Sequence, residues 1–493
     1  MELNSASSAP TQQDLPGLEV KFDLDAFAGD THFVGIGGIG MSALARLLLA
    51  RGKQVSGSDQ QESEITQELE HLGAKIFIGH QASNVIQAGV VVVSTAITDG
   101  NPEFVQAKEM KLPILHRSQI LAQLSKNSKL IAISGTHGKT TTTGMIAQML
   151  LDCGLDPSIV VGGIFERIGS NAHQGKGEYF VAETDESDRT HGTVQSYISV
   201  LTNIEADHLE NYPGGIEQIR DLMLSFANNS KCAIVMCADD PGCQSIASAM
   251  VPRVIRYGRR SAGKALDYSY ESLPGAGMQV FEKAHMLGSL ELSVPGEHNK
   301  ANAMAALTVG MELLQLDFDR VAESLSCFTG VDRRFQIIGE YDNVVVVDDY
   351  AHHPTEVIAT LQAAKQYLEQ RRHNKARLDR VVVLFQPHQP GRLRDLWQEF
   401  CGAFAAADVV LLADVYVARG GEIENINSQR LAQEIKHNNV HYLKGAATTL
   451  PEQVFAYIQP GDLVLTVGAG DVTTVGPELI KHLRGKQTHG SSI

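Results

Sequence analysis

The chain has 493 residues, of which 43% are hydrophobic and 20% charged, a composition typical of a globular protein of about three domains. Its formal net charge of −16 argues against nucleic-acid binding, which needs a basic surface. No apolar run approaches the roughly 20 residues of a membrane-spanning helix, so we expect no membrane insertion. The six scattered cysteines favour reduced thiols and a cytoplasmic protein.

Short apolar strands alternate with helical patterns along most of the chain, which predicts an α/β protein with three consecutive α/β domains. A polar segment at residues 1–22 predicts a disordered tail without a signal peptide. The domains are expected at residues 23–126, 127–331 and 332–493. Residues 259–288 are irregular and predict an antiparallel or loop excursion. The expected strands of the first domain are 32–35, 54–57, 75–78, 90–94 and 114–116.

The first domain carries the glycine pattern Gly35-Ile-Gly-Gly-Ile-Gly40 between a predicted strand and a predicted helix, with Asp59 at the end of the next strand. This G-x-G-x-x-G spacing places a diphosphate at a helix N-terminus and a carboxylate near the adjoining group. A nicotinamide dinucleotide and a UDP-sugar both satisfy that chemistry. A glycine turn that only packs the helix on the strand is the alternative.

The second domain opens with an apolar strand that leads into Gly135-Thr-His-Gly-Lys-Thr140 and then into a helix. Gly135 and Gly138 let backbone N–H groups close around phosphate oxygens, and Lys139 can reach the terminal phosphates. A hydroxyl of Thr140 or Thr141 can ligate Mg²⁺. The pattern is two residues shorter than the common phosphate loop, yet it predicts binding of a nucleoside triphosphate.

Polar residues follow the later strands of this domain. Glu183 is the first acidic residue of Glu183-Thr-Asp-Glu-Ser-Asp188, and His208 ends a similar run after the next strand. The carboxyl ends of parallel strands meet at one sheet edge, so both residues are candidates to hold Mg²⁺ beside the phosphate loop. Asn299 and Asn302 lie three apart at the start of a helix and can serve a base or a domain contact.

The third domain also places polar groups at strand ends. Val347-Asp-Asp-Tyr-Ala-His-His-Pro354 follows one strand, and Phe385-Gln-Pro-His388 follows another. Arg392 and Arg394 come next, and arginines at this position can clamp a carboxylate with two parallel hydrogen bonds. Surface loops and helix caps are the alternative explanation.

These motifs in this order resemble the Mur ligases of peptidoglycan synthesis, and the resemblance covers nearly the whole chain. The segments that carry it are His32–Met41, Gly135–Thr143, Glu183–Asp188, Thr202–His208, Val347–Glu356 and Phe385–His388. The resemblance implies a Rossmann-like domain for a UDP-sugar, a central phosphate-loop domain with a parallel sheet for ATP, and a Rossmann-like C-terminal domain for an amino acid.

The resemblance also implies roles for individual residues. ATP would be bound by Gly135, Thr136, His137, Gly138, Lys139, Thr140, Thr141, His298, Asn299, Asn302 and Arg334. The UDP-sugar would be bound by Gly35, Gly37, Gly38, Gly40, Asp59 and Ser94. Thr140, Glu183 and His208 would hold two Mg²⁺ ions, and the catalytic residues would be Lys139, Glu183, His208, His352 and Arg392.

Within the family, the chain is most similar to the members that add L-alanine to the lactyl carboxylate of UDP-N-acetylmuramate. That activity consumes ATP, passes through an acyl phosphate and releases ADP and phosphate. Met223 stands where other Mur ligases carry a modified lysine, as expected for the alanine-adding type. A monomer or homodimer is expected.

Some positions depart from the family pattern. Gln389 replaces the arginine that commonly follows Gln-Pro-His, so the amino-acid carboxylate clamp rests on Arg392, Arg394 or Arg419. Three other functions compete: a recycling ligase that adds a preformed murein tripeptide, a nicotinamide-dependent dehydrogenase and a nucleotide-switch module. Ser187 favours the alanine-adding type, because the recycling ligases carry tyrosine there.

Overall fold

A computed structural model describes residues 22–185, 194–207, 209–261, 265–373, 378–418 and 421–489. Its contacts divide the chain into two compact units. The first comprises Met1–Ser269 and Met304–Ser324, and the second comprises Tyr270–Ala303 and Leu325–Ile493. The chain passes from one unit to the other within β13 (Tyr268–Ser272), α8 (Glu297–Thr308) and α9 (Phe318–Ser326).

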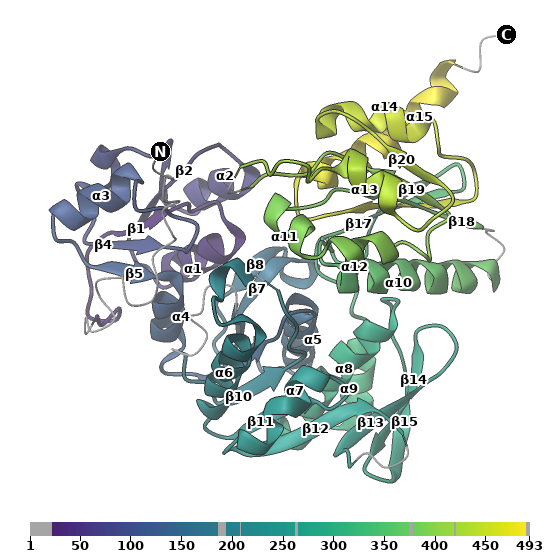
Figure 1. Ribbon diagram of the computed structural model, residues 1–493. Helices are drawn as coiled ribbons and strands as arrows, with labels where there is room; N and C mark the ends of the chain where they lie inside the picture. The colour runs from purple at the N-terminus through teal and green to yellow at the C-terminus, as the bar shows by residue number, and fades with distance from the viewer. Residues whose placement is uncertain are drawn as a thin grey trace. The chain divides into compact units, whose positions relative to one another are not determined.

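The first unit begins with a five-stranded parallel sheet in the order β3-β2-β1-β4-β5, the purple and blue part of the ribbon in Figure 1. Its strands are β1 (Thr31–Val34), β2 (Val55–Asp59), β3 (Lys75–Ile78), β4 (Val90–Val93) and β5 (Ile114–His116). Its helices are α1 (Ile39–Ala50), α2 (Glu64–His71), α3 (Pro102–Glu109) and α4 (Arg117–Ser125). The strand order reverses between β1 and β4, so a ligand crevice is expected outside the carboxyl ends of these two strands.

Seven strands of a ten-stranded sheet lie wholly in this unit, in the order β12-β11-β10-β6-β9-β7-β8, and only β8 runs antiparallel to its neighbour among these seven. The strands are β6 (Lys129–Ser134), β7 (Ser158–Phe165), β8 (Ser170–His173), β9 (Tyr179–Glu183), β10 (Ile198–Leu201), β11 (Ala233–Cys237) and β12 (Arg253–Arg259). The helices are α5 (Lys139–Asp152), α6 (Gly215–Asn228) and α7 (Pro241–Ile246). Because β6 lies between β10 and β9, the chain that leaves β6 meets the segments that leave both neighbours.

The two sheets of the first unit share a core. One apolar cluster includes Phe33 and Leu44 from the first sheet region and Val160 and Phe180 from the second. Helix α1 contacts β7 and β8, and the Asn171 amide on β8 donates to the Ile39 carbonyl at 2.7 Å. The start of α1 is thereby fixed against the second sheet.

The second unit contains a six-stranded sheet in the order β16-β17-β21-β18-β19-β20, in which only β16 is antiparallel. Its strands are β16 (Gln336–Tyr341), β17 (Val344–Asp349), β18 (Arg380–Phe385), β19 (Val409–Leu412), β20 (Val440–Tyr442) and β21 (Asp462–Val467). Its helices are α10 (Pro354–His373), α11 (Pro390–Asp395), α12 (Trp397–Gly402), α13 (Ser428–Glu434), α14 (Leu450–Phe455) and α15 (Val475–His489). Val345 and Val347 enter one apolar cluster while Val344 and Val346 enter another, so this sheet is covered on both faces.

The irregular region expected at residues 259–288 overlaps an antiparallel hairpin of β14 (Gly277–Glu282) and β15 (His285–Glu291), which continues three residues beyond it. In the first sheet, the strands expected at 75–78 and 114–116 have the predicted bounds, and the others shift by one or two residues. Three sheets with helices along the chain confirm the α/β class. Within the described ranges, no helix is both long and apolar enough to cross a lipid bilayer.

Candidate nucleotide and sugar-nucleotide site

The phosphate loop joins the buried strand β6 to helix α5. Gly135 and Gly138 have positive φ angles of 143° and 81°, a backbone region that favours glycine. A Cβ atom on Gly135 would lie 2.0 Å from the Thr202 hydroxyl. Glycine is therefore required at this position by conformation and by space, and the sequence prediction of the loop is confirmed as a strand–loop–helix element.

Residues after β10 fasten this loop. The Asn203 carboxamide accepts from the His137 N–H at 2.7 Å and donates to the His137 carbonyl at 3.0 Å. The Thr202 hydroxyl donates to the same carbonyl at 2.7 Å. Sequence reasoning did not assign Asn203 a role, although its place after a strand end was a usable signal.

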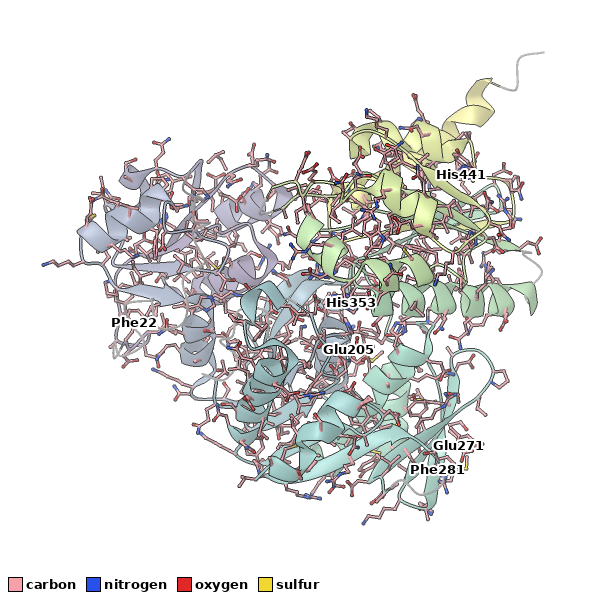
Figure 2. All side chains as sticks on the ribbon, viewed as in Figure 1. Phe22, Glu205, Glu271, Phe281, His353 and His441 are labelled. Atoms are coloured by element: carbon pink, nitrogen blue, oxygen red, sulfur yellow. The ribbon has the colours of Figure 1, made fainter. Side chains whose placement is uncertain are left out.

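A second contact joins the loop to Glu205, which lies on the segment after β10 (Figure 2). The Glu205 N–H donates to the Thr136 hydroxyl at 2.8 Å, and the Glu205 carboxylate lies 3.4 Å from the His137 ring. Thr136 and His137, the two residues between Gly135 and Gly138, are thus held in place by contacts within the protein. Such preorganisation lowers the ordering cost of binding phosphate.

Lys139 begins α5, and its ammonium group turns back into the loop. It donates to the Gly135 carbonyl at 2.6 Å and to the Thr136 carbonyl at 3.1 Å. The cation therefore lies inside the ring of backbone atoms where the sequence placed the ATP phosphates. Thr141 follows in the buried first turn of the helix.

The Thr140 hydroxyl donates to the Glu183 carboxylate at 2.8 Å, which brings together two of the three predicted metal ligands. A hydroxyl and a carboxylate at one point supply the oxygen ligands that Mg²⁺ prefers, so the residues fit that ion. Gly162 on β7 makes room for the carboxylate, since a Cβ there would lie 1.9 Å from Glu183 Oε1. The third predicted ligand, His208, lies outside the described residues.

The glycine fingerprint connects β1 to α1. The Gly35 N–H donates to the Ser58 carbonyl at 2.8 Å, and the Gly37 N–H donates to the Asp59 carboxylate at 2.9 Å. Gly38 precedes the first helical residue. Asp59 therefore braces the loop, a contact that the sequence did not predict. Ser94 follows β4, across the point where the strand order reverses.

A buried polar network under this loop was also not predicted. The Glu103 carboxylate accepts from the Ser58 hydroxyl at 2.6 Å and the Asn84 amide at 2.7 Å, and it lies 3.3 Å from the His32 ring. Burial acts to raise the pKa of Glu103, but the hydrogen bonds from His32, Ser58 and Asn84 outweigh it and lower the pKa. The network ties β1, β2 and α3 together with a charged carboxylate.

In the second unit, α8 carries three residues assigned to ATP. Asn299 donates to the Pro295 carbonyl at 2.7 Å, and Asn302 donates to Asn299 Oδ1 at 3.2 Å. The expected shared face of the two asparagines is confirmed, and His298 lies exposed on the same turn. Arg334 lies 3.9 Å from the Glu356 carboxylate, with its guanidinium 5.2 Å from the Tyr350 ring centroid.

An aromatic array surrounds His352 in the same unit. Its Nδ1 lies 3.0 Å from the Tyr350 carbonyl, and its ring meets that of His388 edge-on at 5.9 Å. His388 stacks on Tyr416 at 5.6 Å. If Nδ1 donates to the carbonyl, the neutral ring keeps its lone pair on Nε2, the form that can accept a proton.

The segment after His388 begins α11. Gln389 has a positive φ of 71°, and its N–H donates to the Tyr416 carbonyl at 2.9 Å. Arg392 lies half-buried on α11, while Arg394 pairs with the adjacent Asp395 at 2.7 Å. Arg419 lies outside the described residues.

Asp349 ends β17, directly before the Tyr350 loop. Its carboxylate accepts from the Phe335 and Ala351 N–H groups at 2.8 Å each. Burial nevertheless raises the pKa of Asp349 to about 6, although the Arg334 cation acts to lower it. A proton can therefore be gained or lost here near neutral pH.

Family comparisons agree with the order of these motifs. Three family models match: "Mur ligase family, catalytic domain" at residues 30–129, "Mur ligase middle domain" at 133–310 and "Mur ligase, glutamate ligase domain" at 333–470.

Individual relatives and a solved structure are similar to this chain over most of its length. A UDP-N-acetylmuramate–L-alanine ligase of Trichlorobacter lovleyi is 42% identical over 459 residues, covering 92% of this chain and 98% of the relative. One of Desulforamulus reducens is 44% identical over 469 residues, with the same coverage. The crystal structure of a UDP-N-acetylmuramate–alanine ligase from Thermotoga maritima has a TM-score of 0.79 at 30% identity, covering 93% of this chain and 100% of that one. This chain belongs to the Mur ligase family.

Proposed function

We propose that this chain is an ATP-dependent ligase that joins L-alanine to the lactyl carboxylate of UDP-N-acetylmuramate, a step of peptidoglycan precursor synthesis. The observation that carries the proposal is the Thr140–Glu183 contact beside the phosphate loop, in the same unit as the glycine fingerprint. A phosphate loop and a diphosphate loop in one compact unit fit an enzyme that brings ATP and a nucleotide sugar together. The names of the relatives described above support the substrates.

The first half-reaction activates the carboxylate. A lactyl carboxylate oxygen attacks the γ-phosphorus of ATP, the bond to the bridging oxygen breaks, and an acyl phosphate and ADP result. Lys139 holds the phosphates within the loop, and Asn203 keeps the loop in shape by accepting from the His137 N–H. A free carboxylate would have to expel oxide, so it needs this phosphorylation before an amine can displace the oxygen.

Thr140 and Glu183 would hold Mg²⁺, which when bound offsets the charge of the phosphate oxygens. A second ion held with His208 remains part of the proposal. The assignment of Gly35, Gly37, Gly38, Gly40, Asp59 and Ser94 to the UDP-sugar is also proposed.

The second half-reaction forms the amide. The ammonium group of L-alanine first gives a proton to His352, which accepts it at Nε2 because Nδ1 faces the Tyr350 carbonyl. The neutral amine then attacks the acyl carbon, and phosphate leaves from the tetrahedral intermediate and carries away the second proton of the nitrogen. Arg392 binds the amino-acid carboxylate, and His298, Asn299, Asn302 and Arg334 contact the nucleotide.

The proposal assigns residues 23–126 to the UDP-sugar, 127–331 to ATP and 332–493 to the amino acid. We also propose that the protein is cytoplasmic and is either a monomer or a homodimer.

The alternative is a ligase that adds a preformed tripeptide to the same sugar nucleotide. The structure of a murein peptide ligase from Psychrobacter arcticus has a TM-score of 0.67 at 22% identity, covering 92% of this chain and 98% of that one. That identity supports a common fold alone, whereas relatives above 40% identity carry the alanine-ligase name.

The test mixes purified chain with UDP-N-acetylmuramate, ATP and Mg²⁺, and adds either L-alanine or the tripeptide. Phosphate release and product mass are measured. Release that requires the sugar nucleotide and L-alanine, with a mass gain of one alanyl residue, supports the proposal. Release only with tripeptide identifies the recycling ligase, and release without any amino-acid dependence contradicts both.

A further inference from the structure

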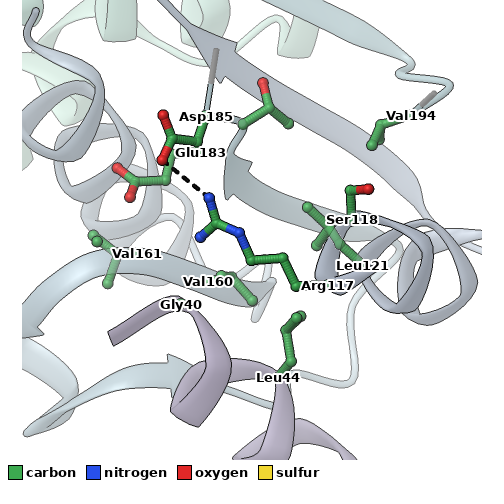
Figure 3. Close-up of a pocket in the computed structure, with 12 residues that line it drawn as sticks. Gly40, Leu44, Arg117, Ser118, Leu121, Val160, Val161, Glu183, Asp185 and Val194 are labelled. Atoms are coloured by element: carbon green, nitrogen blue, oxygen red, sulfur yellow. Dashed lines mark hydrogen bonds and ion pairs between the residues drawn. The ribbon is translucent and has the colours of Figure 1, made fainter. Parts of the chain in front are cut away.

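A cavity of the first unit is lined by Gly40 of the glycine fingerprint and by Glu183, whose carboxylate contacts Thr140 after the phosphate loop (Figure 3). Gly40 and Leu44 of α1 form one wall, and Val160 to Gly162 of β7 form another. Glu183 and Asp185 line the side toward the phosphate loop. The cavity contains about 520 Å³ of empty space, part of it open solvent. A sugar nucleotide with its diphosphate at the first loop would extend through this cavity toward the γ-phosphate of ATP.

Arg117 is the cationic residue among the twelve that line the cavity. It begins α4 directly after β5, and its side chain reaches across the cavity to the acidic pair (Figure 3). Its guanidinium pairs with the Asp185 carboxylate at 3.0 Å, with the arginine side chain 23% exposed and the aspartate 37%. The pair is accessible from the cavity, so an incoming anion can replace the aspartate.

The last fingerprint glycine leaves space for this arginine. A Cβ atom on Gly40 would lie 2.5 Å from Arg117 Nη1. The guanidinium therefore packs against the first turn of α1, beside the N–H groups that the fingerprint assigns to a diphosphate. Glycine at position 40 is therefore needed to leave space for the Arg117 side chain as well as to form the fingerprint loop.

The negative charges of the substrate and of the cavity explain why the proposed reaction needs Arg117. The substrate carries a diphosphate and a lactyl carboxylate, and the carboxylate must approach a region that already holds Glu183 and Asp185. Like charges repel, so the approach needs a cation within the same cavity. A planar guanidinium with several donors suits phosphate and carboxylate oxygens.

We infer that Arg117 binds an oxyanion of the sugar nucleotide, exchanging the Asp185 carboxylate for the substrate. This rests on the proposed function. The oxyanion belongs to the diphosphate or to the lactyl carboxylate, which share the chemistry that an arginine recognises. Arg117 then holds the substrate chain between the two loops while the lactyl oxygen faces ATP.

The test measures equilibrium binding by calorimetry on the full chain, with UDP, UDP-N-acetylglucosamine and UDP-N-acetylmuramate as probes. Arg117→Ala should weaken binding of UDP-N-acetylmuramate by about 10- to 100-fold, the range for a hydrogen bond to a charged group. An equal loss with all three probes assigns the contact to the diphosphate. A loss confined to UDP-N-acetylmuramate assigns it to the lactyl carboxylate, which UDP-N-acetylglucosamine lacks.

Further variants separate substrate binding from a structural role. Asp185→Asn should leave UDP-N-acetylmuramate binding unchanged or tighten it a few-fold, because a competitor for Arg117 is removed. Arg117→Lys should restore part of the affinity. Lys126→Ala, which removes a partly exposed cation just after α4, should change nothing. Binding of a non-hydrolysable ATP analogue reports that each variant is folded.

Two results would overturn the inference. One is unaltered affinity of Arg117→Ala and Arg117→Lys for all three probes. The other is Asp185→Asn weakening binding as much as Arg117→Ala, because the pair would then be structural. If the unaltered chain binds no sugar nucleotide, the proposed function fails together with the inference.

Discussion

Asn203 holds His137 by both of its backbone groups, with Oδ1 accepting from the His137 N–H at 2.7 Å and Nδ2 donating to its carbonyl at 3.0 Å. The two residues are 66 positions apart in the chain, and the pairing of β10 with β6 brings them together. The phosphate loop therefore keeps its shape through a side chain that belongs to the neighbouring strand end.

Asn203→Ala should raise the KM for ATP at least 10-fold. Removal of the carboxamide takes the Asn203 acceptor from the His137 N–H, at a cost of about 1–3 kcal/mol, while the Thr202 hydroxyl still donates to the His137 carbonyl. Binding of UDP-N-acetylmuramate should stay within twofold, because the fingerprint loop is not touched. Asn203→Asp keeps the acceptor but places a carboxylate oxygen against the His137 carbonyl, so it should not rescue. Steady-state kinetics with each substrate varied checks this, and an unchanged KM for ATP contradicts it.

Gly162→Ala should reduce kcat by about 10-fold or more and raise the Mg²⁺ concentration needed for half-maximal rate. The new methyl group would lie 1.9 Å from Glu183 Oε1, so the carboxylate must leave Thr140. Loss of a well-placed ligand of this kind costs several-fold to hundred-fold in affinity or rate. The readout is the initial rate as a function of Mg²⁺.

Gly100→Ala is the matched control for that experiment, because a Cβ at Gly100 meets nothing within 4 Å. Its Mg²⁺ dependence should match that of the unaltered chain. A normal Mg²⁺ dependence in Gly162→Ala would show that Glu183 tolerates displacement.

His352→Gln should lower the alanine-dependent kcat by about 10²- to 10⁴-fold, the usual contribution of a general base. Hydroxylamine is neutral at pH 7 and needs no base before attack, so hydroxamate formation from the acyl phosphate should fall much less. Comparing alanine and hydroxylamine as acceptors isolates the proton transfer. Exposed His482→Gln should leave both rates unchanged, and equal losses with both acceptors in His352→Gln would reject the assignment.

Asp349 should make the stability of the second unit depend on pH. The pKa of Asp349 is raised from 3.8 to about 6 in the folded chain, so between these values the folded state binds more protons than the unfolded state. The free energy of unfolding therefore falls as pH rises from about 4 to about 6 and then levels off. The contribution is on the order of 1–3 kcal/mol.

Asp349→Asn has no titrating group at this position. The temperature midpoint of its thermal unfolding should therefore not show the decrease between pH 4 and pH 6 that Asp349 causes. Relative to the variant, the unaltered chain should lose about 2–6 °C between pH 4 and pH 6. A constant offset is expected as well, because the introduced amide would face the Phe335 N–H with a donor in one orientation. Parallel curves for the two proteins over this range would contradict the prediction.

Local sequence patterns predicted much of the first unit. The fingerprint and the phosphate loop are read from glycine spacing within a strand–loop–helix element, and the positive φ angles of Gly35 and Gly138 explain why glycine stands there. Glu183 was assigned from its place after a strand, and its contact with Thr140 follows from the pairing of β9 with β6. The predicted roles of His208 and Arg419 stay predictions, because both residues lie outside the described ranges.

The amino-acid sequence by itself determined the strands of the first sheet, the two glycine loops and the acidic residue at the end of β9, because each depends on neighbours within one element. Only the tertiary structure decided that Asn203 clasps His137, that Gly162 makes room for Glu183 and that Arg117 meets Asp185 across 68 positions. Strand order sets those pairings, since β6 lies between β10 and β9 while β7 lies beyond β9. Strand order is fixed by the packing of the whole sheet, which no local pattern of residues specifies.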